Sequence, residues 1–151
     1  MKKVLIAYLS HSGNTERMAQ YIAEGVRIAG HEAELKNVSE IKTEKDLTGY
    51  DGYIFGCPTY HLGIPENFET FLSIAEKSKL GGKVGGAFGF RAHPSSGGGD
   101  AAGLIFERME SRFKMMMTSL GGFDMKGGLF EVIEEMHTCQ EYGKAVGEML
   151  I

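Results

Sequence analysis

The sequence predicts an α/β protein in which five parallel strands form one doubly wound sheet with helices on both faces. Short apolar runs alternate with longer amphipathic stretches along the whole chain. Apolar runs are typical of strands buried on both faces, and an intervening helix lets successive strands run parallel. Of the 151 residues, 42% are hydrophobic, which is enough for one core and one domain spanning residues 1–151.

Each element is expected from its local pattern. Strands are expected at residues 4–9, 32–38, 53–57, 83–90 and 128–133. The second is the weakest, because it alternates apolar and polar residues as strands nearer a sheet edge do. The first helix is expected from residue 16 to Gly30, which is placed to end it. Further helices are expected at residues 66–79, 100–120 and 138–150, with a short helical or loop connection at 46–50.

Composition argues against several classes of function. The formal net charge is -4, so nothing indicates binding to nucleic acid or to an anionic membrane. No segment approaches the roughly 20 apolar residues that a membrane helix needs. Cys57 and Cys139 lie far apart without metal-ligand spacing, which indicates a reducing, cytoplasmic compartment and no metal site. Cys57 is expected to be a small apolar filler at the end of a buried strand.

The loop after the first strand has the composition of a phosphate site. It joins an apolar strand to a helix, and free backbone N–H groups at the start of a helix attract anions. The candidate residues are Ser10, His11, Ser12, Gly13, Asn14 and Thr15. The loop has no Lys or Arg, so it is not a P-loop, and it lacks the glycine spacing of a dinucleotide-binding turn. The alternative from these residues alone is an ordinary helix cap by Asn14 or Ser12.

The loop after the third strand indicates a flat ligand. Two prolines stiffen it, Gly63 permits an unusual backbone angle, and Tyr60 offers a ring for stacking. The candidate residues are Pro58, Thr59, Tyr60, His61, Leu62 and Gly63. The alternative is that Tyr60 only covers the end of the sheet.

The loop after the fourth strand offers a second aromatic ring, a fixed cation and a run of glycines. The candidate residues are Gly89, Phe90, Arg91, His93, Gly97, Gly98 and Gly99. By themselves the last three glycines favour a plain surface loop. In doubly wound sheets, however, ligands bind outside the carboxyl ends of the strands. The three loops are therefore expected to form one site, with these glycines as backbone donors to a ligand.

Together, the loops resemble those of the flavodoxin-like family. Residues 10–15 match that family's Ser/Thr-x-Ser/Thr-Gly-x-Thr phosphate loop, and residues 56–60 and 65–68 look like its second loop and following helix. Residues 86–90 look like the third loop of the flavodoxin modules of flavodiiron proteins. The resemblance implies a short-chain flavodoxin with strand order 2-1-3-4-5. It also implies flavin mononucleotide (FMN) as the cofactor, with its phosphate at residues 10–15 and its ring between the second and third loops.

Departures from the family pattern refine the expected flavin site. The chain has no Trp, so Tyr60 is the expected ring partner, with Phe90 second. His61, Arg91 and His93 are expected to make the flavin edge basic, and a fixed cation there would raise the reduction potential. A backbone carbonyl at Gly63 or the preceding peptide is expected to turn toward the flavin N5–H.

The expected function is electron transfer between redox partner proteins by an FMN-binding protein in which no residue is catalytic. The alternative is a NAD(P)H-dependent quinone or flavin reductase of the same fold. The basic flavin edge favours that alternative, and the lack of an extra segment to shape a nicotinamide pocket disfavours it. A signalling receiver domain is excluded, because residues 10–11 and 56–57 are not the acidic residues it requires. Residues 115–117, three methionines in the expected helix 100–120, are compatible with a homodimer.

Overall fold

The computed structural model describes residues 1–10, 13–59, 63–91, 100–126 and 133–150. One parallel sheet has the order β2-β1-β3-β4-β5, and a sixth strand, β6, also pairs with β4. The strands are β1 (Lys3–Tyr8), β2 (Glu32–Asn37), β3 (Gly52–Pro58), β4 (Val84–Arg91), β5 (Met116–Met117) and β6 (Phe123–Lys126). The predicted parallel α/β fold and its strand order are confirmed, with β2 at one edge of the sheet.

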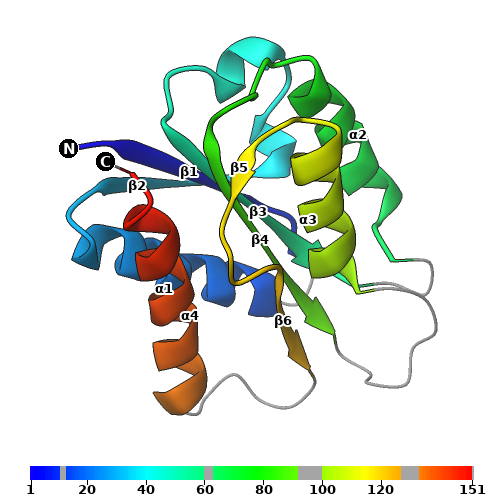
Figure 1. Ribbon diagram of the computed structural model, residues 1–151. Helices are drawn as coiled ribbons and strands as arrows, with labels where there is room; N and C mark the ends of the chain where they lie inside the picture. The colour runs from blue at the N-terminus through cyan, green and yellow to red at the C-terminus, as the bar shows by residue number, and fades with distance from the viewer. Residues whose placement is uncertain (11–12, 60–62, 92–99, 127–132, 151) are drawn as a thin grey trace.

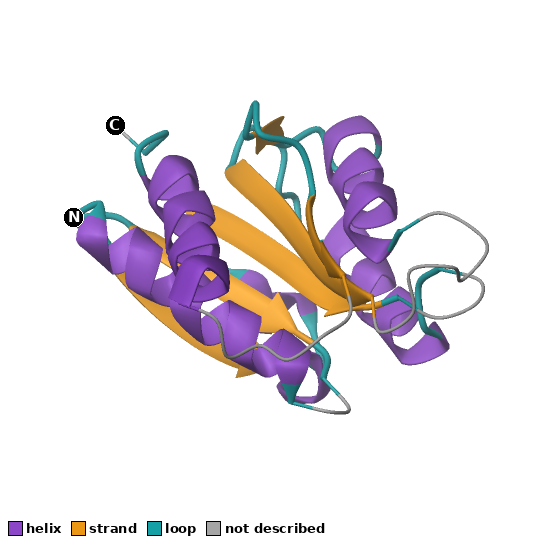
Figure 2. Cartoon of the chain, turned by 90° about the horizontal axis from the view of Figure 1, so that it is seen from below, coloured by secondary structure: helices purple, strands orange, loops and turns teal. Residues whose placement is uncertain are grey.

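Helices cover both faces of the sheet (Figure 1). The α-helices are α1 (Asn14–Ile28), α2 (Glu66–Glu76), α3 (Ala101–Ser111) and α4 (Ile133–Gly147). Two short 3-10 helices, η1 (Val38–Glu40) and η2 (Glu44–Leu47), follow β2. Figure 2 shows α1 and α4 together on one side of the sheet and α2 and α3 on the other. Gly30 ends α1 as expected, with a φ of 95°. Within the described ranges, no helix is long and apolar enough to cross a membrane.

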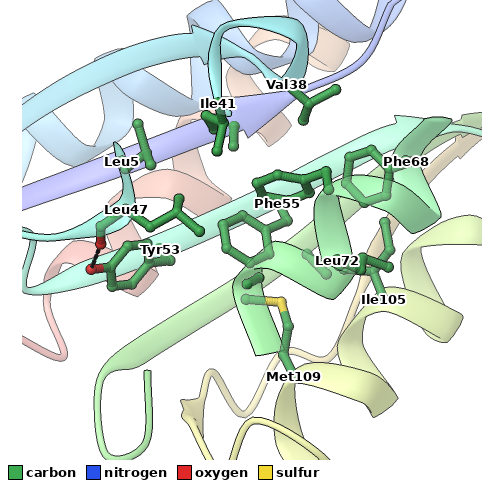
Figure 3. Close-up of a cluster of buried hydrophobic side chains, with 14 of the residues drawn as sticks. Leu5, Val38, Ile41, Leu47, Tyr53, Phe55, Phe68, Leu72, Ile105 and Met109 are labelled. Atoms are coloured by element: carbon green, nitrogen blue, oxygen red, sulfur yellow. Dashed lines mark hydrogen bonds between the residues drawn. The ribbon is translucent and has the colours of Figure 1, made fainter. Parts of the chain in front are cut away.

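Two apolar cores lie between these layers because successive strand residues face opposite sides of the sheet. In β1, Val4 and Ile6 pack toward α1 and α4, whereas Leu5 and Ala7 pack toward α2 and α3. The core between the sheet and helices α2 and α3 is drawn in Figure 3, where Phe55 of β3 lies near Phe68 and Leu72 of α2. The core between the sheet and helices α1 and α4 includes Phe88 and Phe90 of β4. The sheet is thus buried on both faces, as its apolar strands predicted.

The helix expected at residues 100–120 is much shorter than predicted. α3 ends at Ser111, and Lys114 takes a left-handed conformation with a φ of 57°. The chain then turns into β5, where Met116 N–H donates to the Lys83 carbonyl at 2.8 Å. Met116 and Leu120 matched the helical spacing, yet both are 59% exposed. Pairing with the edge of β4 therefore overrides the local helical pattern.

The strand expected at residues 128–133 was also misplaced. Residues 128–132 lie outside the described part of the chain, and Ile133 is the first residue of α4. The strand beside the carboxyl-terminal half of β4 is β6, in which apolar and polar residues alternate. The fifth position of the sheet is therefore filled by two short strands rather than one, with β5 beside Val84 and Gly85 and β6 beside residues 88–91.

A tyrosine from α4 fills the break between β5 and β6. The hydroxyl of Tyr142 accepts a hydrogen bond from the Ala87 N–H at 3.0 Å and donates one to the Gly121 carbonyl at 2.7 Å. Ala87 belongs to β4, and Gly121 lies in the segment that joins β5 to β6. The side chain thus replaces the strand contact that β4 lacks at this point.

Candidate functional site

The carboxyl ends of β1, β3 and β4 meet at one edge of the sheet, as their arrowheads in Figure 1 show. In register, Tyr8 of β1 lies beside Gly56 of β3, and Pro58 of β3 lies beside Phe90 of β4. Hydrogen bonds extend this alignment past the strands, because Leu9 N–H donates to the Gly56 carbonyl at 3.0 Å. The three candidate loops therefore leave the sheet at the same edge.

Among the described residues, no side chain is seen to cap the start of α1. Its N-cap is Gly13, which has a φ of 90° and makes no side-chain cap hydrogen bond. Asn14 is already the first residue of the helix, so it is not the N-cap, and Ser12, the other cap of the alternative interpretation, lies outside the described residues. The N–H of Gly13 donates to Ser10 Oγ at 3.0 Å, and Gly13 has no heavy atom within 4 Å of where a Cβ would stand. This open helix start, with a glycine as its N-cap, is suited to an anion.

Thr15, in the first turn of α1, is the buried member of the first loop. The residue is 2% exposed, although its side chain carries a hydroxyl. His11 and Ser12 lie outside the described residues. The side chains placed here are thus Ser10, which fixes Gly13, and Thr15, which lies next to the helix start.

The start of α3 lies at the same edge, but other protein groups already accept hydrogen bonds from its backbone N–H groups. Asp100 is its N-cap and accepts from the Gly103 N–H through Oδ1. The N–H of Ala101 donates to Thr59 Oγ1 at 2.9 Å. Thr59 N–H in turn donates to the Phe90 carbonyl at 2.8 Å. Thr59, expected as a ligand residue, therefore joins the ends of β3 and β4 to the first turn of α3.

Only the two ends of the second loop are described. Pro58 is the last residue of β3, and Gly63 is buried with a φ of 97°, which agrees with the unusual backbone angle expected there. Tyr60, His61 and Leu62 lie outside the described residues. Stacking on Tyr60 therefore stays a prediction.

In the third loop, Phe90 has a different role from the expected one. It is 7% exposed and belongs to the cluster under α1 and α4, so its ring is not an open stacking platform. Gly89 packs closely, since a Cβ there would lie 3.1 Å from Ala102 N and 3.2 Å from the Cys57 carbonyl oxygen. His93 and the glycines at 97–99 are beyond the described ranges.

Arg91, expected as a fixed cation at the flavin edge, is paired with two acidic residues. Its side chain is 12% exposed and lies between two carboxylates, with Asp124 Oδ2 at 3.7 Å from Nε and Asp100 Oδ2 at 3.8 Å from an Nη atom. Sequence reasoning missed both acidic residues. Asp100 could have been found as a helix cap before an apolar pattern. Asp124 could not, because its strand was placed in the wrong segment.

Two further groups at this edge are uncharged in the neutral pH range. Cys57 is fully buried, and burial raises the pKa of its thiol, which agrees with its expected role as an apolar filler. Tyr8, at the end of β1, was not singled out from the sequence. Partial burial raises its pKa, and the nearby carboxylates of Glu16 and Glu40 raise it further.

Comparison with known proteins agrees with this arrangement. The family model described as "Flavodoxin" matches residues 6–136, which include most of the chain and all three loops. The chain belongs to the flavodoxin family. Flavodoxins are FMN-binding electron-transfer flavoproteins, and the open, glycine-capped start of α1 fits the phosphate of that cofactor.

Individual relatives show how far the similarity reaches. A flavodoxin from Clostridium saccharobutylicum is 37% identical over 101 residues, which are 66% of this chain and 62% of that protein. A NAD(P)H dehydrogenase (quinone) from Acidovorax ebreus is 35% identical over 111 residues, 58% of this chain and 56% of that protein. The chain thus spans less than two thirds of either relative. The structure of oxidised flavodoxin 1 from Bacillus cereus matches with a TM-score of 0.83 and 26% identity, covering 99% of both chains.

Proposed function

We propose that this chain is one FMN-binding domain that transfers electrons between redox partner proteins. The observation that carries the proposal is the start of α1 at Gly13, a glycine N-cap with open space around it, at the sheet edge where the three loops meet. Bound FMN would supply one- and two-electron redox chemistry. The protein binds and orients it, and no side chain is required as an acid or base.

Residues 10–15 are proposed to hold the phosphate with neutral groups. Backbone N–H groups at the start of α1 and the positive end of its dipole attract the anion. The Ser10 hydroxyl accepts from the Gly13 N–H and so fixes the turn that presents those groups. A buried hydroxyl at Thr15 adds a further donor.

The flavin ring is proposed to lie between the second and third loops, with Tyr60 as its stacking partner. Phe90 does not stack on the flavin in this proposal, because its ring is buried in the core. Pro58, Gly63 and Gly89 are proposed to shape the site through their backbones.

A NAD(P)H-dependent quinone reductase is the second candidate. It is favoured by the similarity to the Acidovorax ebreus quinone dehydrogenase. A flavodoxin-type carrier is preferred because the Clostridium saccharobutylicum flavodoxin aligns with 66% of the chain at 37% identity, whereas the dehydrogenase aligns with 58% of it at 35% identity. The sulfurs of Cys57 and Cys139 are both free and buried, which supports a reducing, cytoplasmic location.

The test begins with the visible absorption spectrum of the purified protein, reconstituted with FMN. Bound FMN with quenched fluorescence is expected, and a protein that leaves FMN fluorescence unchanged would contradict both candidates. Anaerobic mixing with NADPH or NADH then separates them. Slow bleaching that a partner reductase accelerates supports the carrier, and rapid bleaching by the nucleotide alone supports the reductase.

A further inference from the structure

Three charged residues form a compact cluster at the carboxyl edge of the sheet: Arg91, Asp100 and Asp124. Arg91 and Asp124 side chains are each 12% exposed, and Asp100 is 38% exposed. The distances of 3.7 and 3.8 Å are those of ion pairs rather than of direct hydrogen bonds. With one cation between two carboxylates, 1 − 2 gives the cluster a formal charge of −1.

Each member of the cluster belongs to a different element. Arg91 is the last residue of β4, and Asp124 lies in β6, where it pairs in register with Gly89. Asp100 is the N-cap of α3. One carboxylate therefore does two things, since Oδ1 of Asp100 accepts from the Gly103 N–H while Oδ2 faces Arg91.

A second set of contacts links the same elements. Thr59 follows β3, and its N–H and hydroxyl bind the Phe90 carbonyl and the Ala101 N–H. The first turn of α3 is therefore held from β3 by Thr59 and from β4 by Arg91. A guanidinium group suits this position because its planar fork can face two carboxylates at once.

Burying the charges of Arg91 and Asp124 is costly, so their pairing is weak evidence for a contribution to stability. Buried ion pairs seldom add stability over an apolar replacement, but removing one partner leaves the others uncompensated. Removal of Arg91 would leave Asp100 and Asp124 without their shared cation. The mutual repulsion of the two carboxylates would then act on the first turn of α3 and on β6.

We propose that Arg91 is a positioning residue, which fixes the first turn of α3 and the end of β4 relative to each other and so preorganises the cofactor edge. The role in cofactor binding rests on the proposed function, whereas the attachment of α3 does not. Preorganisation of this kind increases affinity by removing the cost of ordering on binding.

The test compares Arg91→Gln, Asp124→Asn and the double variant with the wild-type chain. Two quantities are measured: the Kd for FMN by fluorescence quenching, and amide hydrogen exchange of Ala101 and Gly103 in the FMN-free protein. Arg112→Gln is the matched control, because Arg112 also ends α3 in an ion pair, with Glu76 at 3.4 Å, but its side chain is 65% exposed.

Arg91→Gln and Asp124→Asn are each expected to weaken FMN binding about tenfold. The double variant is expected to bind FMN no more weakly than the single variant that binds it less tightly, because the two residues act as a pair. Exchange at Ala101 and Gly103 should be faster in Arg91→Gln and unchanged in Arg112→Gln. Unchanged exchange in Arg91→Gln, or losses that multiply in the double variant, would overturn the proposal. If the wild-type chain binds no FMN but Arg91→Gln still speeds exchange, the proposed function fails and the attachment of α3 stands.

Discussion

Gly25 of α1 and Gly143 of α4 bring the backbones of these two helices into direct contact. A Cβ on Gly25 would lie 1.9 Å from the Gln140 carbonyl oxygen, and a Cβ on Gly143 would lie 1.9 Å from that of Ile22. Neither glycine has a positive φ, so the need for glycine comes from the close approach. The crossing fixes α1, whose first turn lies at the proposed phosphate site.

Gly143→Ala is therefore expected to destabilise the protein by about 3 kcal/mol or more, since the clash is with backbone and the helices must separate. Urea unfolding followed by circular dichroism measures this effect. Gly81→Ala is the control, because its Cβ would meet nothing closer than 3.7 Å and its φ is not positive. Equal stability of the two variants would show that α1 and α4 are not in backbone contact.

Thr15→Ala is expected to weaken FMN binding by about tenfold to a hundredfold, the range for loss of a hydrogen bond to a charged group. Fluorescence titration with FMN, and with riboflavin, measures the change. Riboflavin has no phosphate, so its affinity should not change. An equal loss for both ligands would place Thr15 away from the phosphate.

Tyr142→Phe is expected to cost about 1–3 kcal/mol of stability, because the Ala87 N–H loses its acceptor in a buried place. Thr48→Ala removes an exposed hydroxyl bond to the Lys45 carbonyl and is expected to change stability by less than about 0.5 kcal/mol. Chemical denaturation of both variants makes the comparison. A Tyr142→Phe protein as stable as Thr48→Ala would mean that water replaces the hydroxyl.

Cys139 predicts a loss of stability in alkali. Burial, and then the Glu135 carboxylate, raise the pKa of its thiol from 9.0 to about 12. Between these pH values the folded state keeps a proton that the unfolded state releases. The contribution of the Cys139 thiol to the free energy of unfolding is therefore intact below about pH 9 and falls as the pH rises toward 12. Thermal unfolding of wild type and Cys139→Ala at pH 8 and pH 10.5 tests it. The wild type should lose more Tm than the variant between these pH values, and equal losses would contradict the assignment.

The parallel sheet was predictable because its inner strands are continuous apolar runs. The position of the first loop was predictable because it directly follows one of these runs. The sequence pattern misplaced elements where long-range contacts decide the structure. Met116 has helical spacing, but the free edge of β4 draws it into a strand. Phe90 has the type of a stacking residue, yet alternation along β4 turns its ring into the core.

The charge of Arg91 could be read from the sequence, but its environment could not. Its two carboxylates lie 9 and 33 positions further along the chain, at Asp100 and Asp124. Their proximity depends on β6 pairing beside β4, which the sequence pattern did not place correctly. The cation expected at the flavin edge is paired with two carboxylates, those of Asp100 and Asp124.

Because the fifth strand is broken into β5 and β6, the segment between them is expected to tolerate an inserted sequence. Ser119 and Leu120 are exposed, and β5 and β6 each pair with β4 on their own. Tyr142 holds Gly121 from α4, and a turn in which the Gly121 N–H donates to the Thr118 carbonyl at 3.3 Å joins the two halves. A reporter or binding module joined between residues 119 and 120 would leave the cofactor edge intact, and the sheet would carry it as a rigid mount.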